Sequence, residues 1–123
     1  MIGRRGQRGS AVVEFALVIP LVLVVLLAAA ELAVVARTQL ELVNAAREGA
    51  RTAATVADPA EAAAAVRHAL GDGGAEARVH VTRPHVVGAP ATVAVSKVHR
   101  VGLPLFGGFT VELSARSVMR VER

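Results

Sequence analysis

An uncharged run between two glutamates constrains this chain more than any other feature. Residues 15–30 contain no charged side chain, and apolar residues at 11–13 and 32–36 flank them. Together these stretches exceed the roughly 20 residues that an α-helix needs to cross a bilayer core about 30 Å thick. The sequence therefore predicts one membrane-spanning helix over residues 10–36, with the lipid bilayer as its partner. Residues 37–123 remain for one small domain.

The basic residues are concentrated in front of this run. Arg4, Arg5 and Arg8 precede it, and without them the chain would carry 11 basic against 10 acidic side chains instead of 14 against 10. Most of the net charge of +4 therefore lies in the segment that precedes the membrane helix. This distribution argues against a basic surface that binds nucleic acid. Basic flanks mark the cytoplasmic side of a membrane segment. We expect residues 1–9 to be a basic leader inside the cell and residues 37–123 to lie outside the cytoplasmic (inner) membrane, with one crossing.

Three residues within or beside the apolar run need an explanation. Glu14 and Glu31 are seventeen positions apart, or roughly 26 Å along a helix, so each is expected near one face of the hydrocarbon. Pro20 has no amide proton, and its ring should bend the helix near Ala16. A carboxylate at the depth of Glu14 is costly unless it has a partner.

The residues around Glu14 resemble a known processing site. Gly9, the residues Ser10-Ala11-Val12-Val13 and then Glu14-Phe15 are similar to the prepilin-peptidase site of type IV pilin-like proteins. In that site the cut follows the glycine, and glutamate is the fifth residue of the mature chain. The wider stretches "RGSAVVEFALVIPLVL", "ELVNAAREGAR" and "SARSVMRVE" are similar to the TadE-like family of minor pseudopilins in tight-adherence (Flp-type) pilus systems.

This resemblance implies a structural role in secretion and cell adhesion rather than an enzymatic one. It implies processing between Gly9 and Ser10 by a prepilin peptidase, and an assembly role for Glu14 and Phe15. The implied partners are other pilins and pseudopilins and the proteins of the pilus assembly platform. The mature subunit would stay in the inner membrane or be incorporated in the pilus.

The spacing also gives Glu14 a physical role. A cut after Gly9 would free an α-amine on Ser10, and residues four apart lie on one face of a helix. That amine can neutralise Glu14 within one chain or between neighbouring chains, which lowers the cost of the carboxylate at this depth. Cleavage would also remove the three arginines that hold this end at the cytoplasmic headgroups.

Other interpretations of the apolar run remain open. It can be an ordinary anchor whose Glu14 reaches the headgroups. It can also be a cleavable secretory signal, because Ala28-Ala29-Ala30 before Glu31 fits the small-residue pattern of a signal-peptidase site. Either reading leads to the alternative function, a membrane-anchored or signal-peptide-secreted extracytoplasmic binding module.

The helical period continues past the membrane segment. A polar stripe at spacings of three and four predicts the ion pairs Arg37–Glu41 and Glu48–Arg51; it consists of Arg37, Glu41, Asn44, Glu48, Arg51 and Thr55. The opposite face is apolar and mostly small, and it consists of Leu42, Val43, Ala46, Gly49, Ala50, Ala53 and Ala57. We expect this face to cover a sheet, so that one helix runs from the membrane into the domain.

A second helix is predicted after a clear start signal. Asp58 is placed as an N-cap, Pro59 as the first helical residue and Glu61 as the returning partner of a capping box. The helix should run to Leu70 and stop at Gly71, with residues 71–74 as a loop.

Beyond that loop the period changes from 3.6 to 2, which predicts strands in residues 77–83, 91–101 and 109–121. Pro84, Pro90 and Pro104 lie between them, and Gly107-Gly108 precedes the third. In the third strand the apolar face is Phe109, Val111, Leu113, Ala115, Met119 and Val121. The expected buried side of the sheet is Val79, Val81, Val93, Val95, Val111 and Leu113. The predicted fold is therefore α+β: a long N-terminal helix entering a pilin-like domain with a short second helix and a three-stranded antiparallel sheet.

Enzyme chemistry finds little support in these residues. The chain has no cysteine, and its aromatic content of 2% argues against a large ligand pocket or a small-molecule substrate. His80, His85 and His99 show no metal-ligand spacing, and we expect neither a metal nor a cofactor. Nucleophile elbows, phosphate-binding loops and acid–base pairs are missing from the sequence.

Overall fold

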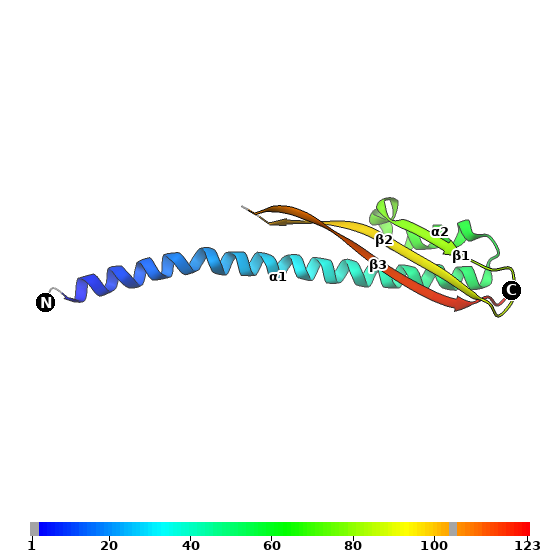
Figure 1. Ribbon diagram of the computed structural model, residues 1–123, viewed down its shortest axis with the longest axis horizontal. Coiled ribbons are helices and arrows are strands. Elements are labelled where there is room, and N and C mark those ends of the chain that lie inside the picture. Colours follow the sequence, from blue (N-terminus) through cyan, green and yellow to red (C-terminus); the bar gives the residue numbers. More distant parts are fainter. Residues whose placement is uncertain (1–2, 104–105) are drawn as a thin grey trace. The chain divides into compact units, whose positions relative to one another are not determined.

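The computed structural model describes residues 3–103 and 106–123, with side chains from Gly6 onward. The side chains of Arg4 and Arg5, and the predicted turn residue Pro104, lie outside that description. The chain divides into two compact units, Met1–Val34 and Val35–Arg123, which we call the N-terminal and the C-terminal unit. Helix α1 (Gly3–Thr55) contributes to both, and all other elements belong to the C-terminal unit (Figure 1).

The N-terminal unit consists of the first part of α1. Pro20 lies inside α1, which continues through this residue as one unbroken helix. Every side chain from residue 6 to residue 30 is exposed, including the large apolar ones. The helix over Gly6–Thr55 is long and apolar enough to cross a membrane, judged by length and composition. An apolar helix with no protein covering it suggests a membrane anchor.

The C-terminal unit contains the rest of α1, helix α2 (Pro59–Leu70), the 3₁₀ helix η1 (Gly71–Glu76) and three strands. The strands are β1 (Arg78–Thr82), β2 (Pro90–Leu103) and β3 (Gly107–Arg120). They form one antiparallel sheet in the order β1-β2-β3, with Val79 opposite Val95 and Val95 opposite Ala115. The α+β fold is therefore confirmed, including the short second helix and the three-stranded sheet.

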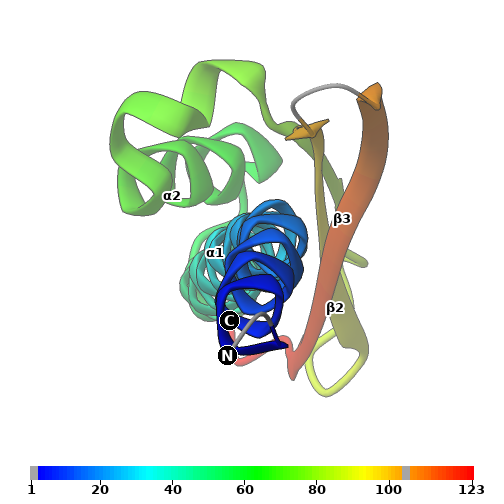
Figure 2. The same ribbon diagram turned by 90° about the vertical axis from the view of Figure 1, so that its left-hand side faces the viewer.

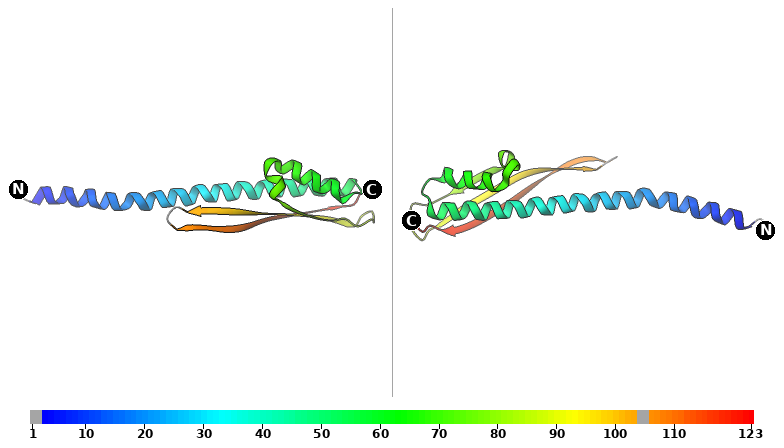
Figure 3. Two further views of the ribbon diagram at one scale, coloured as in Figure 1. Left: turned by 90° about the horizontal axis from the view of Figure 1, so that it is seen from above. Right: turned by 180° about the vertical axis from the view of Figure 1, so that it is seen from behind.

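The sheet has unequal strands. β1 pairs only with Thr92–Ser96 of β2, whereas β2 and β3 pair along their whole length. Residues 97–103 and 107–113 therefore form a two-stranded ribbon that extends past the end of β1 (Figure 3).

The core lies between the helices and one face of the sheet. α2 and the C-terminal part of α1 are on the same side of the sheet (Figure 2). The buried residues of the helices are mostly alanine, so the helix backbones approach the strands closely; the largest fully buried side chains are Leu42, Val66, Val93, Val95 and Val121. Of the predicted buried side, Val93, Val95 and Leu113 are buried, and Val79, Val81 and Val111 pack against them half-buried.

Hydrogen bonds fasten the end of the chain to the end of α1. The amide of Glu122 donates to the carbonyl of Ala54 at 2.8 Å. The Arg83 side chain donates through Nε to the Ala53 carbonyl at 2.6 Å and through its terminal nitrogen to the Arg123 carbonyl. One guanidinium therefore joins the last turn of α1 to the loop after β1 and to the C-terminus.

Several local predictions need correction. α1 ends at Thr55, so Ala57 lies beyond the helix and is exposed instead of joining the small-residue face. Residues 71–74 belong to the 3₁₀ helix η1 and not to an irregular loop, whereas the predicted stop of α2 is confirmed, since Gly71 takes φ 62° directly after Leu70. Pro90 begins β2, a position at the start of a strand where its missing amide costs no ladder bond.

Of the two ion pairs predicted on the surface of α1, the structure contains one. Arg37 and Glu41 form the predicted pair at 3.0 Å. Glu48 and Arg51, both described in the structure, form no such pair within 4.0 Å, and their backbone carbonyls accept the hydroxyls of Thr52 and Thr55.

Candidate functional site

The first candidate site is the segment around Glu14, and all of it is helical. Gly9, Ser10, Glu14 and Phe15 lie in α1 with exposed side chains. The Ser10 hydroxyl donates to Oε1 of Glu14 at 3.3 Å, across one helical turn. The structure therefore brings together the two residues that the sequence paired, through the hydroxyl of Ser10.

Gly9 has no packing reason to be glycine in this chain. A Cβ built on it meets nothing within 4 Å, and the same holds for Gly6. Glycine inside a helix costs about 1 kcal/mol relative to alanine, so the fold gains nothing from it at this position. The contrast is Gly49, where a Cβ would clash with Val66 and crowd Val93.

The motif "ELVNAAREGAR" forms one wall of the core. Its apolar positions Leu42, Ala45, Ala46 and Ala50 are fully buried, and Gly49 is buried beside them. Its charged positions 41, 47, 48 and 51 are exposed. The motif is therefore a packing element, which the sequence interpretation of a helix covering a sheet correctly anticipated.

The three histidines considered as metal ligands do not form a metal site. His80 lies exposed on β1, His85 lies in the loop after it, and His99 is half-buried on β2. Within residues 6–103 and 106–123, no three His, Asp or Glu side chains are grouped closely enough to hold a metal ion.

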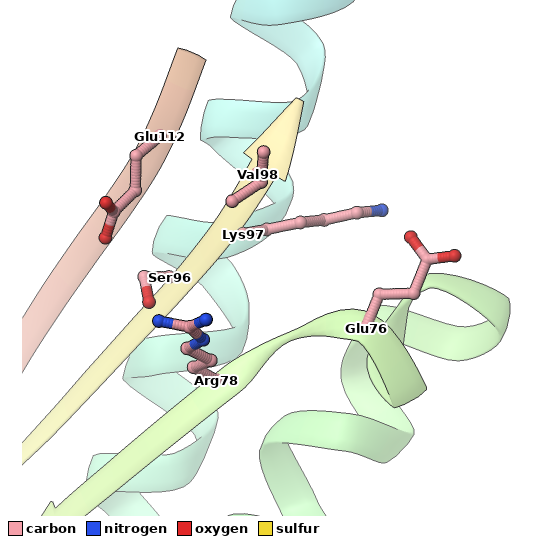
Figure 4. Close-up of a pocket in the computed structure, with 6 residues that line it drawn as sticks. All are labelled: Glu76, Arg78, Ser96, Lys97, Val98 and Glu112. Atoms are coloured by element: carbon pink, nitrogen blue, oxygen red, sulfur yellow. The ribbon is translucent and has the colours of Figure 1, made fainter. Parts of the chain in front are cut away.

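A cleft of about 200 Å³ lies where η1 leads into β1. Glu76, Arg78, Ser96, Lys97, Val98 and Glu112 line it, and Lys97 and Glu76 extend toward each other (Figure 4). Its two cations and two carboxylates balance, so the cleft favours neither an anion nor a cation. The arrangement contains no nucleophile aligned with a base.

Sequence patterns did not identify the structural role of Arg83. This residue follows β1 directly and precedes Pro84, where neither helical nor strand period gives a signal. Its role depends on α1 and the C-terminus arriving at the same place, which only the fold reveals.

Comparison with known proteins finds a family match within the N-terminal half of this chain. Residues 9–51 match the family model described as TadE-like protein, from Gly9 through the buried motif to Arg51. No curated protein and no solved structure matches the chain. The stretch "SARSVMRVE" lies outside the matched residues, so its resemblance to the family stays a prediction. The TadE-like family is tied to Tad pilus systems and consists of pilus components, not enzymes. The predicted resemblance is thus confirmed over residues 9–51, where the chain is similar to the TadE-like family.

Proposed function

We propose that this chain is a minor pseudopilin-like subunit of a tight-adherence (Flp-type) pilus assembly system and is processed by a prepilin peptidase after Gly9. The observation that carries the proposal is the family match, which begins at Gly9 and covers both the apolar helix and the buried motif. The subunit is anchored in the inner membrane through residues 10–36. Residues 1–9 are cytoplasmic, and residues 37–123 form an extracytoplasmic domain.

The open surroundings of Gly9 support a processing role. Because a Cβ at residue 9 meets nothing within 4 Å, packing does not require the glycine. A peptidase that must place the peptide bond after residue 9 in a narrow site does require a residue without a side chain. The exposure of the whole segment leaves this bond accessible to a membrane-embedded enzyme.

The contact between Ser10 and Glu14 supports an assembly role. In the uncut chain the bond is a hydroxyl-to-carboxylate hydrogen bond of 3.3 Å. After the cut, the same residue carries an ammonium group close to the same carboxylate, and an ion pair replaces a weak neutral donor. Within the membrane this pairing, in one chain or between neighbours, offsets much of the cost of burying Glu14. Phe15 and the rest of the exposed apolar face then pack against neighbouring pilins.

The test uses matched glycine variants in the native host. Gly9→Val should leave an uncut precursor, whereas Gly6→Val, an equally open position in the same helix, should be processed normally. Precursor and mature bands are read on immunoblots. Normal cleavage of the Gly9→Val chain would refute the pseudopilin assignment.

A second pair of variants separates processing from assembly. Glu14→Gln keeps the size and removes the charge, so it should be cut yet give far fewer pili or incorporated subunits than the wild type. Glu31→Gln, the same change at the other end of the apolar run, is the control and should assemble. Wild-type piliation with Glu14→Gln would reject the pairing role, and a mature chain beginning at Glu31 would instead favour a secreted binding module.

A further inference from the structure

The turn between β2 and β3 exposes an unusual amount of apolar surface. Two of the three phenylalanines of the chain lie in this turn or directly after it: Phe106 is 73% exposed, and Phe109, in β3, is 55% exposed. Leu103, half-buried, precedes them. We call Leu103 and residues 106–109 the ribbon tip, since they end the two-stranded ribbon of β2 and β3 (Figure 3).

The backbone next to the tip carries few side chains. Gly102 pairs with Gly108 and Leu103 with Gly107, so two successive rows of the ribbon carry at most one side chain. Gly107 takes φ 76°, and a Cβ on Gly108 would sit 3.0 Å from the Val101 carbonyl oxygen. Phe106 and Phe109 therefore flank two rows that add almost no side-chain cover, and Phe109 stays 55% exposed although it pairs with Val101.

Two hydrogen bonds show which end of the C-terminal unit carries the tip. Gln39 of α1 donates to the Ser114 carbonyl at 2.8 Å, and the Glu122 amide donates to the Ala54 carbonyl. β3 therefore runs in the same direction as α1 within this unit. Gly107 precedes Ser114 by seven residues, or about 23 Å of strand, whereas Val35 precedes Gln39 by four residues, or about 6 Å of helix. Within the C-terminal unit, the tip thus lies at the end where α1 enters it.

The charges near the tip suit a bilayer surface. The sequence from residue 77 to residue 111 contains no aspartate or glutamate, and the first carboxylate after it, on Glu112, lies at the base of the ribbon opposite Val98, farther from the tip than Arg100. Arg100, exposed, lies on the ribbon behind the tip, opposite Thr110. An apolar end with a guanidinium one layer behind it matches the order of acyl chains and phosphates at a membrane interface.

We propose that the ribbon tip inserts Phe106 and Phe109 into the outer headgroup–acyl boundary of the bilayer that the chain spans, as a second membrane contact. The proposal rests on the anchor in the proposed function, because covalent connection at Val35 tethers this end of the unit to that bilayer. The contact would limit tilting of the C-terminal unit until the subunit leaves the membrane.

The chain offers a clean probe, because it contains neither tryptophan nor tyrosine. Single-tryptophan chains Phe106→Trp and Phe109→Trp are reconstituted, at full length, in phosphatidylcholine vesicles with and without bromine on the acyl chains. Val87→Trp is the matched control, since Val87 is 66% exposed in the loop that the Gly88–Val121 hydrogen bond holds near the C-terminus. Leu23→Trp reports on the anchor itself.

Brominated lipid should reduce the emission of Phe106→Trp and Phe109→Trp about twofold, with a blue-shifted maximum, and leave Val87→Trp unchanged. Tip tryptophans that behave like Val87→Trp while Leu23→Trp is quenched would overturn the tip contact and leave the anchor intact. A blue shift without bromine quenching would also overturn it, because a protein surface would then cover the tip. An unquenched Leu23→Trp would refute the anchor, and with it the proposed function.

Discussion

Replacing Gly49 with alanine adds one methyl group to a helix contact that has no room for it. The new Cβ would overlap Cγ2 of Val66 on α2 and lie 3.0 Å from Cγ1 of Val93 on β2. Both valines are fully buried and branched at Cβ, so neither can swing its methyl group aside easily. Because the obstacles belong to two different elements, a shift of α1 away from one of them worsens the contact with the rest of the core.

Two opposing free-energy contributions determine how much Gly49→Ala destabilises the protein. Overpacking a well-filled core costs about 1–3 kcal/mol. Alanine gains about 1 kcal/mol over glycine inside a helix. Because the new Cβ would overlap Val66 outright, the overpacking cost should fall in the upper part of its range, at about 2–3 kcal/mol. The net loss should then be about 1–2 kcal/mol, which for a unit of this size lowers Tm by about 5–15 °C. Thermal unfolding of the full chain in detergent, followed by circular dichroism, measures it.

Gly102→Ala is the control for this substitution. Gly102 lies in β2 of the same unit, and a Cβ there meets nothing within 4 Å. It should change stability by less than about 0.5 kcal/mol. A Gly49→Ala chain as stable as the wild type, or more stable, would show that the core yields at this contact and would refute the packing account of the family motif.

Two further substitutions test how the C-terminal unit is held together. Arg83→Ala should destabilise the chain by about 2 kcal/mol in denaturant titrations, because it removes charged hydrogen bonds to the Ala53 and Arg123 carbonyls; Arg83→Lys, which keeps the charge but not the fork, should recover only part of this loss. Asp58→Ala should cost about 1 kcal/mol, since Asp58 Oδ1 caps α2 by accepting the Ala60 amide at 2.9 Å, and Asp58→Ser should restore most of it. An unchanged unfolding midpoint in either alanine variant would contradict the assigned contact.

The parts of the fold that sequence predicted are those where one period persists. Residues 37–55 repeat their small apolar positions at helical spacing, and the structure buries that face from Leu42 to Ala54. The alternation around Val93 and Val95 likewise gave the buried side of the sheet. In both cases the pattern exists because one face is in contact and the other is in water.

The remaining details depend on partners distant in sequence. Phe109 shares a face with Leu113 as the alternation predicts, yet it is exposed, because alternation indicates a face and not how far the covering helices reach. Arg83 acquires its partners only when α1 and the C-terminus meet. At the candidate site, the Ser10–Glu14 contact follows from spacing alone, because four residues on a helix bring side chains together whatever the rest of the chain does.

The first residue of the mature chain shows directly whether a prepilin peptidase cuts this protein after Gly9. Intact-mass analysis of the protein purified from membranes of its native host determines this residue without any substitution. We expect a chain that begins at Ser10 and lacks residues 1–9 with their three arginines. A chain that retains the leader and begins at Met1, or one that begins at Glu31 after removal of the apolar run, would contradict this expectation.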